Sequence, residues 1–71
     1  MDRSVQLRRL AEAEQHIARG TQRISHQELR IAEFDVRGQD STLARSLLET
    51  FRTIQTQHVA HRITSLRRLG L

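Results

Sequence analysis

The sequence predicts an all-α, single-domain protein (residues 1–71) that folds as a two-helix antiparallel hairpin and dimerises into a four-helix bundle. Three observations lead to this fold class. The chain of 71 residues contains no proline and only three glycines. A seven-residue repeat, which corresponds to two helical turns, runs through its first half. Residues 37–41 carry clustered turn signals between two amphipathic stretches.

The first predicted helix covers about residues 3–36. Each repeat opens with a large aliphatic residue that is followed by a small one. The large residues are Leu10, Ile17, Ile24 and Ile31, and the small ones are Ala11, Ala18, Ser25 and Ala32. Large and small side chains that alternate at this spacing form one stripe, which we expect to let an antiparallel helix approach closely.

The predicted turn at residues 37–41 has the expected signals on both sides. Gly38 suits the left-handed position just after a helix C-terminus, and Arg37 complements the helix dipole there. Asp40 is a good N-cap, which we expect to accept a hydrogen bond from the amide of Thr42 or Leu43. A connection this short makes the two helices antiparallel neighbours.

The second predicted helix covers about residues 41–69 and ends before Gly70. Its apolar stripe is Ala44, Leu47, Leu48, Phe51 and Ile54. We expect the hairpin core to consist of Leu10, Ile17, Ile24, Ile31, Leu47, Phe51 and Ile54. Beyond Ile54 the strict repeat continues onto His58 and His61, whereas the apolar residues move sideways to Val59, Ile63 and Leu66. Either the seam, which is the line of contact between the two helices, rotates there, or a polar layer interrupts the core.

Dimerisation follows from the small size of the chain. Two helices bury each other on one side only, and small domains of this kind need additional support. The chain has no cysteine and therefore no disulfide. We expect a homodimer because several apolar residues flank the seam and need cover. These residues are Leu29, Phe34, Leu43, Val59, Ile63 and Leu66.

Several functional classes are disfavoured by composition. No unbroken apolar stretch reaches the roughly 7–15 residues of a secretory signal or the about 20 of a membrane span, so we expect a cytoplasmic protein without a membrane partner. No nucleophile elbow, phosphate-binding loop or paired carboxylates are present, which argues against an enzyme and a cofactor. The acidic Glu14, Glu28 and Asp35 are expected either to set the register of the helices or to pair with arginines of the other helix or of a second subunit, namely Arg45, Arg52 or Arg62.

His58-x-x-His61 is a candidate metal-binding pair, because residues three apart share one helical face. Antiparallel pairing brings Glu14 within about one turn of these histidines. The simpler interpretation is two polar residues at the rim of the seam. The spacing matches no Glu-x-x-His or His-Glu-x-x-His pattern, so we expect no metal site.

A basic patch lies on the outer side of the first helix. Its members are His16, Arg19, Arg23, His26 and Arg30. Such a patch provides the minimum positive charge that a protein needs to bind phosphates. It is also typical of a solvated face in a protein that uses 12 arginines and no lysine, with a net charge of +4. The helices contain no motif of known nucleic-acid readers, so nucleic-acid binding remains the alternative function.

Two segments carry a resemblance to known proteins. Residues 10–20 and 47–51, followed by Gln57-His-Val-Ala-His-Arg, resemble a group of small uncharacterised bacterial helical-hairpin proteins, and the similarity covers about residues 7–69. It implies the hairpin and transfers no catalytic or binding residue. In size and topology the chain is also similar to the RNA-binding plasmid regulator Rop, without a shared motif. The sequence thus favours a homodimeric interaction or scaffold protein, which binds itself and other proteins.

Overall fold

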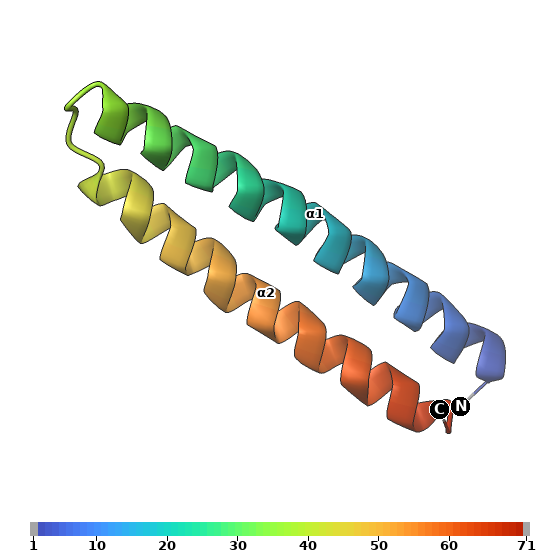
Figure 1. Ribbon diagram of the computed structural model, residues 1–71. Helices are drawn as coiled ribbons and strands as arrows, with labels where there is room; N and C mark the ends of the chain where they lie inside the picture. The colour runs from blue at the N-terminus through green and yellow to red at the C-terminus, as the bar shows by residue number, and fades with distance from the viewer. Residues whose placement is uncertain (1, 71) are drawn as a thin grey trace.

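The computed structural model describes residues 2–70 and consists of two helices, α1 (Arg3–Val36) and α2 (Thr42–Arg68). The helices run antiparallel and side by side, and both termini lie at the same end (Figure 1). The hairpin is a rod whose backbone measures 54 × 15 × 14 Å. The predicted hairpin is therefore confirmed, and α2 begins and ends one residue inside the expected range.

The end of α1 shows why the chain turns where it does. Gly38 has a φ of 68°, the left-handed conformation that glycine adopts without a steric penalty. The amide of Gly38 donates to the carbonyl of Asp35 at 3.2 Å, and the amide of Gln39 donates to that of Phe34 at 2.8 Å. This pair of bonds is a Schellman motif, and it confirms the predicted role of Gly38.

The start of α2 is fixed by Asp40. One carboxylate oxygen of Asp40 accepts from the amide of Thr42 at 3.0 Å and from its hydroxyl at 2.6 Å. The predicted hydrogen bond to Thr42 is confirmed. The cap position itself belongs to Ser41, because the helix begins at Thr42 and Asp40 lies one residue earlier.

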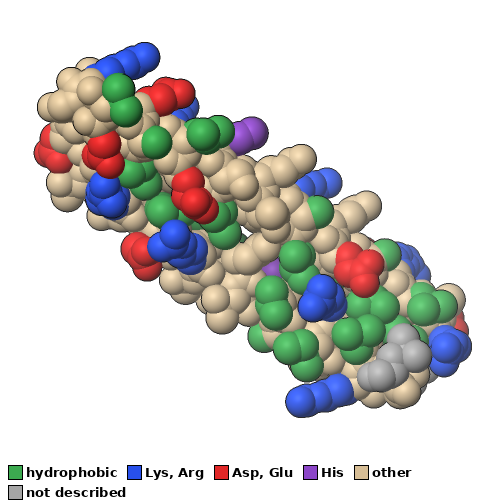
Figure 2. Space-filling model, viewed as in Figure 1, with side chains coloured by type: hydrophobic (Ala, Val, Ile, Leu, Met, Phe, Trp, Pro, Cys, Tyr) green, Lys and Arg blue, Asp and Glu red, His purple; other side chains and the backbone are tan. Residues whose placement is uncertain are grey.

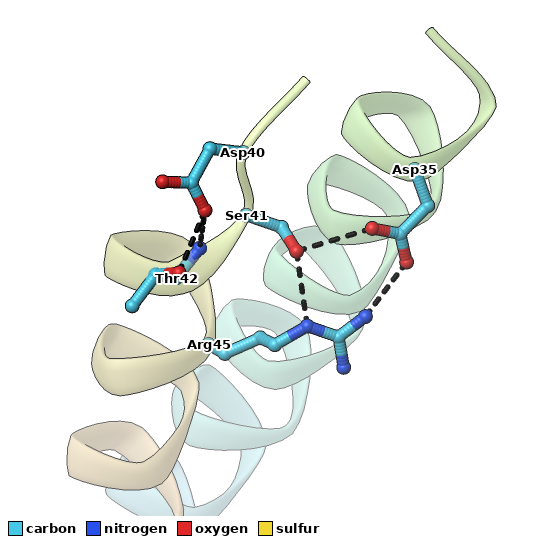
Figure 3. A network of polar contacts seen from close by, with 5 residues as sticks. All are labelled: Asp35, Asp40, Ser41, Thr42 and Arg45. Atoms are coloured by element: carbon cyan, nitrogen blue, oxygen red, sulfur yellow. Dashed lines mark hydrogen bonds and ion pairs between the residues drawn. The ribbon is translucent and has the colours of Figure 1, made fainter. Parts of the chain in front are cut away.

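A polar network ties the two helices together beside the turn (Figure 3). Arg45 donates to the carboxylate of Asp35 at 2.7 Å and to the hydroxyl of Ser41 at 3.0 Å. Ser41 is buried and donates to the second carboxylate oxygen of Asp35 at 3.1 Å. The expected pairing of Asp35 with Arg45 is confirmed. Arg52 instead pairs with Glu49 on its own helix, at 3.1 Å.

The face that α1 turns towards α2 differs from the expected one. The column of large residues lies in the seam as predicted, with Ile31 buried and the other three half-buried. The small residues that follow them are all exposed. The second seam column lies on the other side of the aliphatic one and consists of Gln6, Ala13, Gly20, Gln27 and Phe34. The close approach of the helices therefore depends on Ala13 and Gly20.

The seam of α2 requires a similar correction. Ala44 and Leu48 are buried and form a cluster with Ile31, against which Ile24 and Phe34 pack. Phe34 thus belongs to the seam rather than to its flank. The expected core residues Leu47 and Ile54 are 41% and 37% exposed. The reason is the register of α2. Its seam positions are residues 44, 48, 51 and 55, so residues 47 and 54 lie beside the seam and not in it.

Beyond Phe51 the seam becomes polar, which decides between the two alternatives left open by the sequence. Gln55, His58, Arg62 and Ser65 are half-buried at consecutive seam positions. The Nε2 atom of Gln55 donates to the carbonyl of Ile17 at 2.9 Å and to the hydroxyl of Thr21 at 3.2 Å. A Cβ atom at Gly20 would collide with the Oε1 atom of Gln55. Glycine at position 20 therefore makes room for this crossing side chain.

Replacement of Gln55 by leucine is expected to stabilise the hairpin. The Oε1 atom of Gln55 is buried without a hydrogen-bond partner, and the carbonyl of Ile17 also accepts from the hydroxyl of Thr21. Gln55→Leu should therefore raise the free energy of unfolding by about 1 kcal/mol, measured by urea denaturation at constant protein concentration. The exposed Gln57→Leu variant is the control, with an expected change below about 0.5 kcal/mol. A destabilised Gln55→Leu variant would contradict this prediction.

Acid should weaken both helix starts. Hydrogen bonds from the hydroxyl and then the amide of Thr42 hold the pKa of Asp40 below its ordinary value of 3.8, and Ser4 does the same for the pKa of Asp2. Because the folded-state pKa lies below the unfolded one, this stabilisation is complete above the ordinary pKa and disappears as the pH falls through the folded-state pKa. Asp40→Ala should lower the melting temperature at pH 6 by a few degrees. The gap to the wild type should close towards pH 2 in thermal melts followed by circular dichroism; a constant gap would refute the prediction.

Candidate functional site

The seam is bordered by two different flanks. On one side, which we call the ion-pair flank, the column Leu7, Glu14, Thr21, Glu28 and Asp35 of α1 faces the column Arg45, Arg52, Val59 and Leu66 of α2. On the other side, which we call the basic flank, the column Arg9, His16, Arg23 and Arg30 of α1 faces the column Leu47, Ile54, His61 and Arg68 of α2. Positively charged and apolar side chains therefore meet across the basic flank.

Two surface hollows follow each other along the basic flank. The hollow nearer the termini has a volume of about 390 Å³, and its lining residues are Arg9, Glu12, Ala13, His16, His61, Thr64, Ser65 and Arg68. The hollow nearer the middle of the rod has a volume of about 240 Å³, and its lining residues are His16, Arg19, Gly20, Arg23, Phe51, Ile54 and His58. Because His16 lines both hollows, we treat them as one feature and call it the basic groove.

Two histidines form the centre of the basic groove. The rings of His16 and His58 stack with their centroids 4.9 Å apart and their planes 11° from parallel. His16 is exposed on α1, whereas His58 is half-buried at a seam position of α2. Each ring supports the other, so the contact fixes the position of His16 at the junction of the two hollows.

Within the described residues, the arginines of the basic groove form no ion pair with a carboxylate. Among residues 2–70 the ion pairs are Asp35–Arg45 and Glu49–Arg52, and neither involves the groove. Arg9, Arg19, Arg23 and Arg68 line the hollows together with one acidic residue, Glu12. The groove is therefore a concave surface with excess positive charge, which is suited to binding anions.

The residues singled out from the sequence fall into two groups. His16, Arg19 and Arg23 lie together in the basic groove, whereas His26 and Arg30 are exposed and line neither hollow. His58 and His61 line different hollows, and the exposed Glu14 lines neither. Within residues 2–70 no group of three or more histidine, aspartate or glutamate side chains is arranged to hold a metal ion.

The contribution of α2 to this surface was not recognised from the sequence as a site. His61 and Arg68 complete the groove, and His58 supports it from the seam. The signal was available in the turn position. Folding the chain about Gln39 sets His61 opposite Ile17, next to His16, and Arg68 opposite Leu10, next to Arg9. Combining the basic residues of both helices in this pairing would have outlined the groove.

Comparisons with protein-family models, with curated proteins and with solved structures gave no match for this chain. The resemblance to small bacterial hairpin proteins is therefore not confirmed, and the established part is the two-helix architecture. In the described part of the chain, neither helix combines the length and the apolar character that crossing a membrane requires.

Zinc is expected not to stabilise the protein. Imidazole lone pairs lie in the ring plane, so the stacked rings of His16 and His58 direct their nitrogens along parallel planes rather than towards one ion. One equivalent of ZnCl₂ should change the melting temperature by less than about 1 °C and give no saturable heat in calorimetry. A saturable heat that disappears in the His58→Gln variant would show that a metal site exists.

Proposed function

We propose that this chain is a non-catalytic interaction protein that works as a homodimer, with two hairpins packed as an antiparallel four-helix bundle. Its role would be to present fixed surfaces to other molecules on a stable rod. The proposal rests above all on the surface that a single hairpin leaves exposed.

A single hairpin exposes more surface than a compact protein of its size. Its accessible area is 5464 Å², and its mass is 8.3 kDa. A compact monomer of this mass exposes about 4600 Å². The difference of about 900 Å² is similar to the roughly 800 Å² that each partner buries in an interface of standard size. Pairing of two copies would therefore bring the chain to the surface area of an ordinary folded protein.

The distribution of apolar side chains supports one position for the proposed second copy. On the face shown in Figure 2, hydrophobic side chains gather over the half of the rod that holds the termini. Val59, Ile63 and Leu66 lie at i, i+4 and i+7 on α2, and Ile63 is 42% exposed. Leu7 on α1 is 46% exposed. We call Leu7, Val59, Ile63 and Leu66 the apolar patch.

Small residues on α1 favour close packing at the same place. Ala11 and Ala18 are exposed and follow the seam residues Leu10 and Ile17 on the side of the ion-pair flank. Small side chains let a neighbouring helix approach until backbone and side chains are in contact. A second hairpin placed on the apolar patch would therefore cover this patch and the alanines together.

The mass of the protein in solution tests the proposal. Light scattering at micromolar concentration should give about 16.6 kDa, twice the 8.3 kDa of the chain. Ile63→Glu places a charge in the apolar patch and should weaken the dimer at least about tenfold. The matched control is Leu43→Glu, because Leu43 is 86% exposed near the turn and outside the patch. A monomeric wild type would refute the homodimer, and dissociation caused only by Leu43→Glu would refute the assignment of the interface.

A further inference from the structure

We propose that the basic groove binds the phosphodiester backbone of a single-stranded nucleic acid. The inference is independent of dimerisation, because the groove lies on the basic flank and the apolar patch lies on the opposite side of the seam. It also differs from a patch on the outer side of α1, because half of the groove comes from α2.

Charge is the first argument. Four arginines line the groove, and none of them forms an ion pair with another residue of the range 2–70. Glu12 is the one carboxylate among the lining residues. Guanidinium groups donate hydrogen bonds in a planar fork that matches phosphate oxygens. Phosphates that bind there release condensed counterions, which provides a favourable free energy at low salt.

The extended shape of the groove favours a linear ligand. Arg9 and Arg23 are 14 residues apart on one helix, which corresponds to about 21 Å along its axis. Arg68 lies beside Arg9, and Arg19 lies beside Arg23. Positive charge is therefore present at both ends of the groove, so an extended strand satisfies more of these arginines than a small anion does.

The floor of the groove has groups for the rest of a nucleotide. Phe51 and Ile54 supply apolar surface in the hollow nearer the middle of the rod, and Gly20 adds no side chain there. The ring of His16, held by His58, stands between the hollows. Exposed bases and sugars of a single strand can contact such ring and apolar surfaces, as they do in other single-strand binding grooves.

A duplex fits this surface less well. The backbone of the rod alone measures 15 × 14 Å in cross-section, whereas the major groove of B-DNA is about 12 Å wide. The two helices cannot enter it together, so the groove between them cannot reach base edges or follow one strand of a duplex closely. Single strands have no such restriction.

The test uses the full chain and fluorescein-labelled 12-nucleotide oligo(U) and oligo(dT), with fluorescence anisotropy as the readout. Both strands should bind at 50 mM salt. If four phosphates are contacted, affinity should fall roughly 50-fold between 50 and 200 mM salt. No binding at 50 mM salt, or binding that salt does not change, would overturn the proposal.

Paired variants locate the binding surface. Arg19→Gln with Arg23→Gln should reduce affinity at 50 mM salt at least about tenfold and make the salt dependence less steep. Arg8→Gln with Arg67→Gln removes the same charge from exposed residues that line neither hollow, and it should change affinity less than about threefold. Circular dichroism checks that each variant is folded. An equal loss in both pairs would overturn the groove as the site.

Competitors distinguish the nucleic acid strand from other sources of phosphate. Inorganic polyphosphate of equal charge should displace the labelled strand less effectively than unlabelled oligo(U), because it has no bases or sugars to contact Phe51 and Ile54. A duplex of the same length should also compete more weakly than the single strand. Equal competition by polyphosphate would reduce the site to a general polyanion site, and stronger competition by the duplex would refute the preference for single strands.

Discussion

The narrow seam between the helices is the constraint on which the rest of the molecule depends. Each helix offers two columns of residues to its partner, and these columns contain glutamine, glycine, serine, histidine and arginine as well as aliphatic residues. Within residues 2–70 no large side chain is fully buried. Because the seam can hide so little, both flanks remain exposed surfaces with their own character. One flank is ion-paired and apolar, and the other is basic.

The polar residues of the seam give it a defined register. Gln27 is 5% exposed and donates to the carbonyl of Ala44 at 2.9 Å, and Gln55 crosses over Gly20 to reach Ile17. A shift by one heptad would set Gln55 against Ala13 or Gln27, where a Cβ atom occupies the space. Polar groups at such positions commonly specify register at some cost in stability. Here the register also decides that His16 meets His58, and hence it shapes the basic groove.

The sequence predicted the parts of this structure that depend on local interactions. The turn was predictable because Gly38 and Asp40 act through backbone conformations and hydrogen bonds within a few residues. The helices were predictable from the heptads. The side of the stripe that faces the partner was not predictable from one helix. Leu47 and Leu48 are adjacent and both apolar, and only the register with α1 decides that Leu48 is buried and Leu47 is 41% exposed.

Because the register between the helices is not visible in one helix alone, only the α1 part of the basic groove was predicted from the sequence. His16, Arg19 and Arg23 were visible as neighbours because they lie on one helix. His61 and Arg68 join them only after the hairpin closes. The half of the groove that comes from α2 is therefore recognisable only when the residues of both helices are combined in the pairing that the turn sets.

The apolar patch and the basic groove lie on opposite sides of the seam, so one hairpin can use both surfaces at the same time. If the apolar patch joins two hairpins, each hairpin keeps its basic groove on the side that faces away from the interface. The dimer then carries two grooves at a fixed separation. A strand long enough to reach both would bind the second groove at a high effective concentration, so its affinity would exceed that for a single hairpin without any new contact. Dimerisation would then strengthen binding while leaving the chemistry of each groove unchanged.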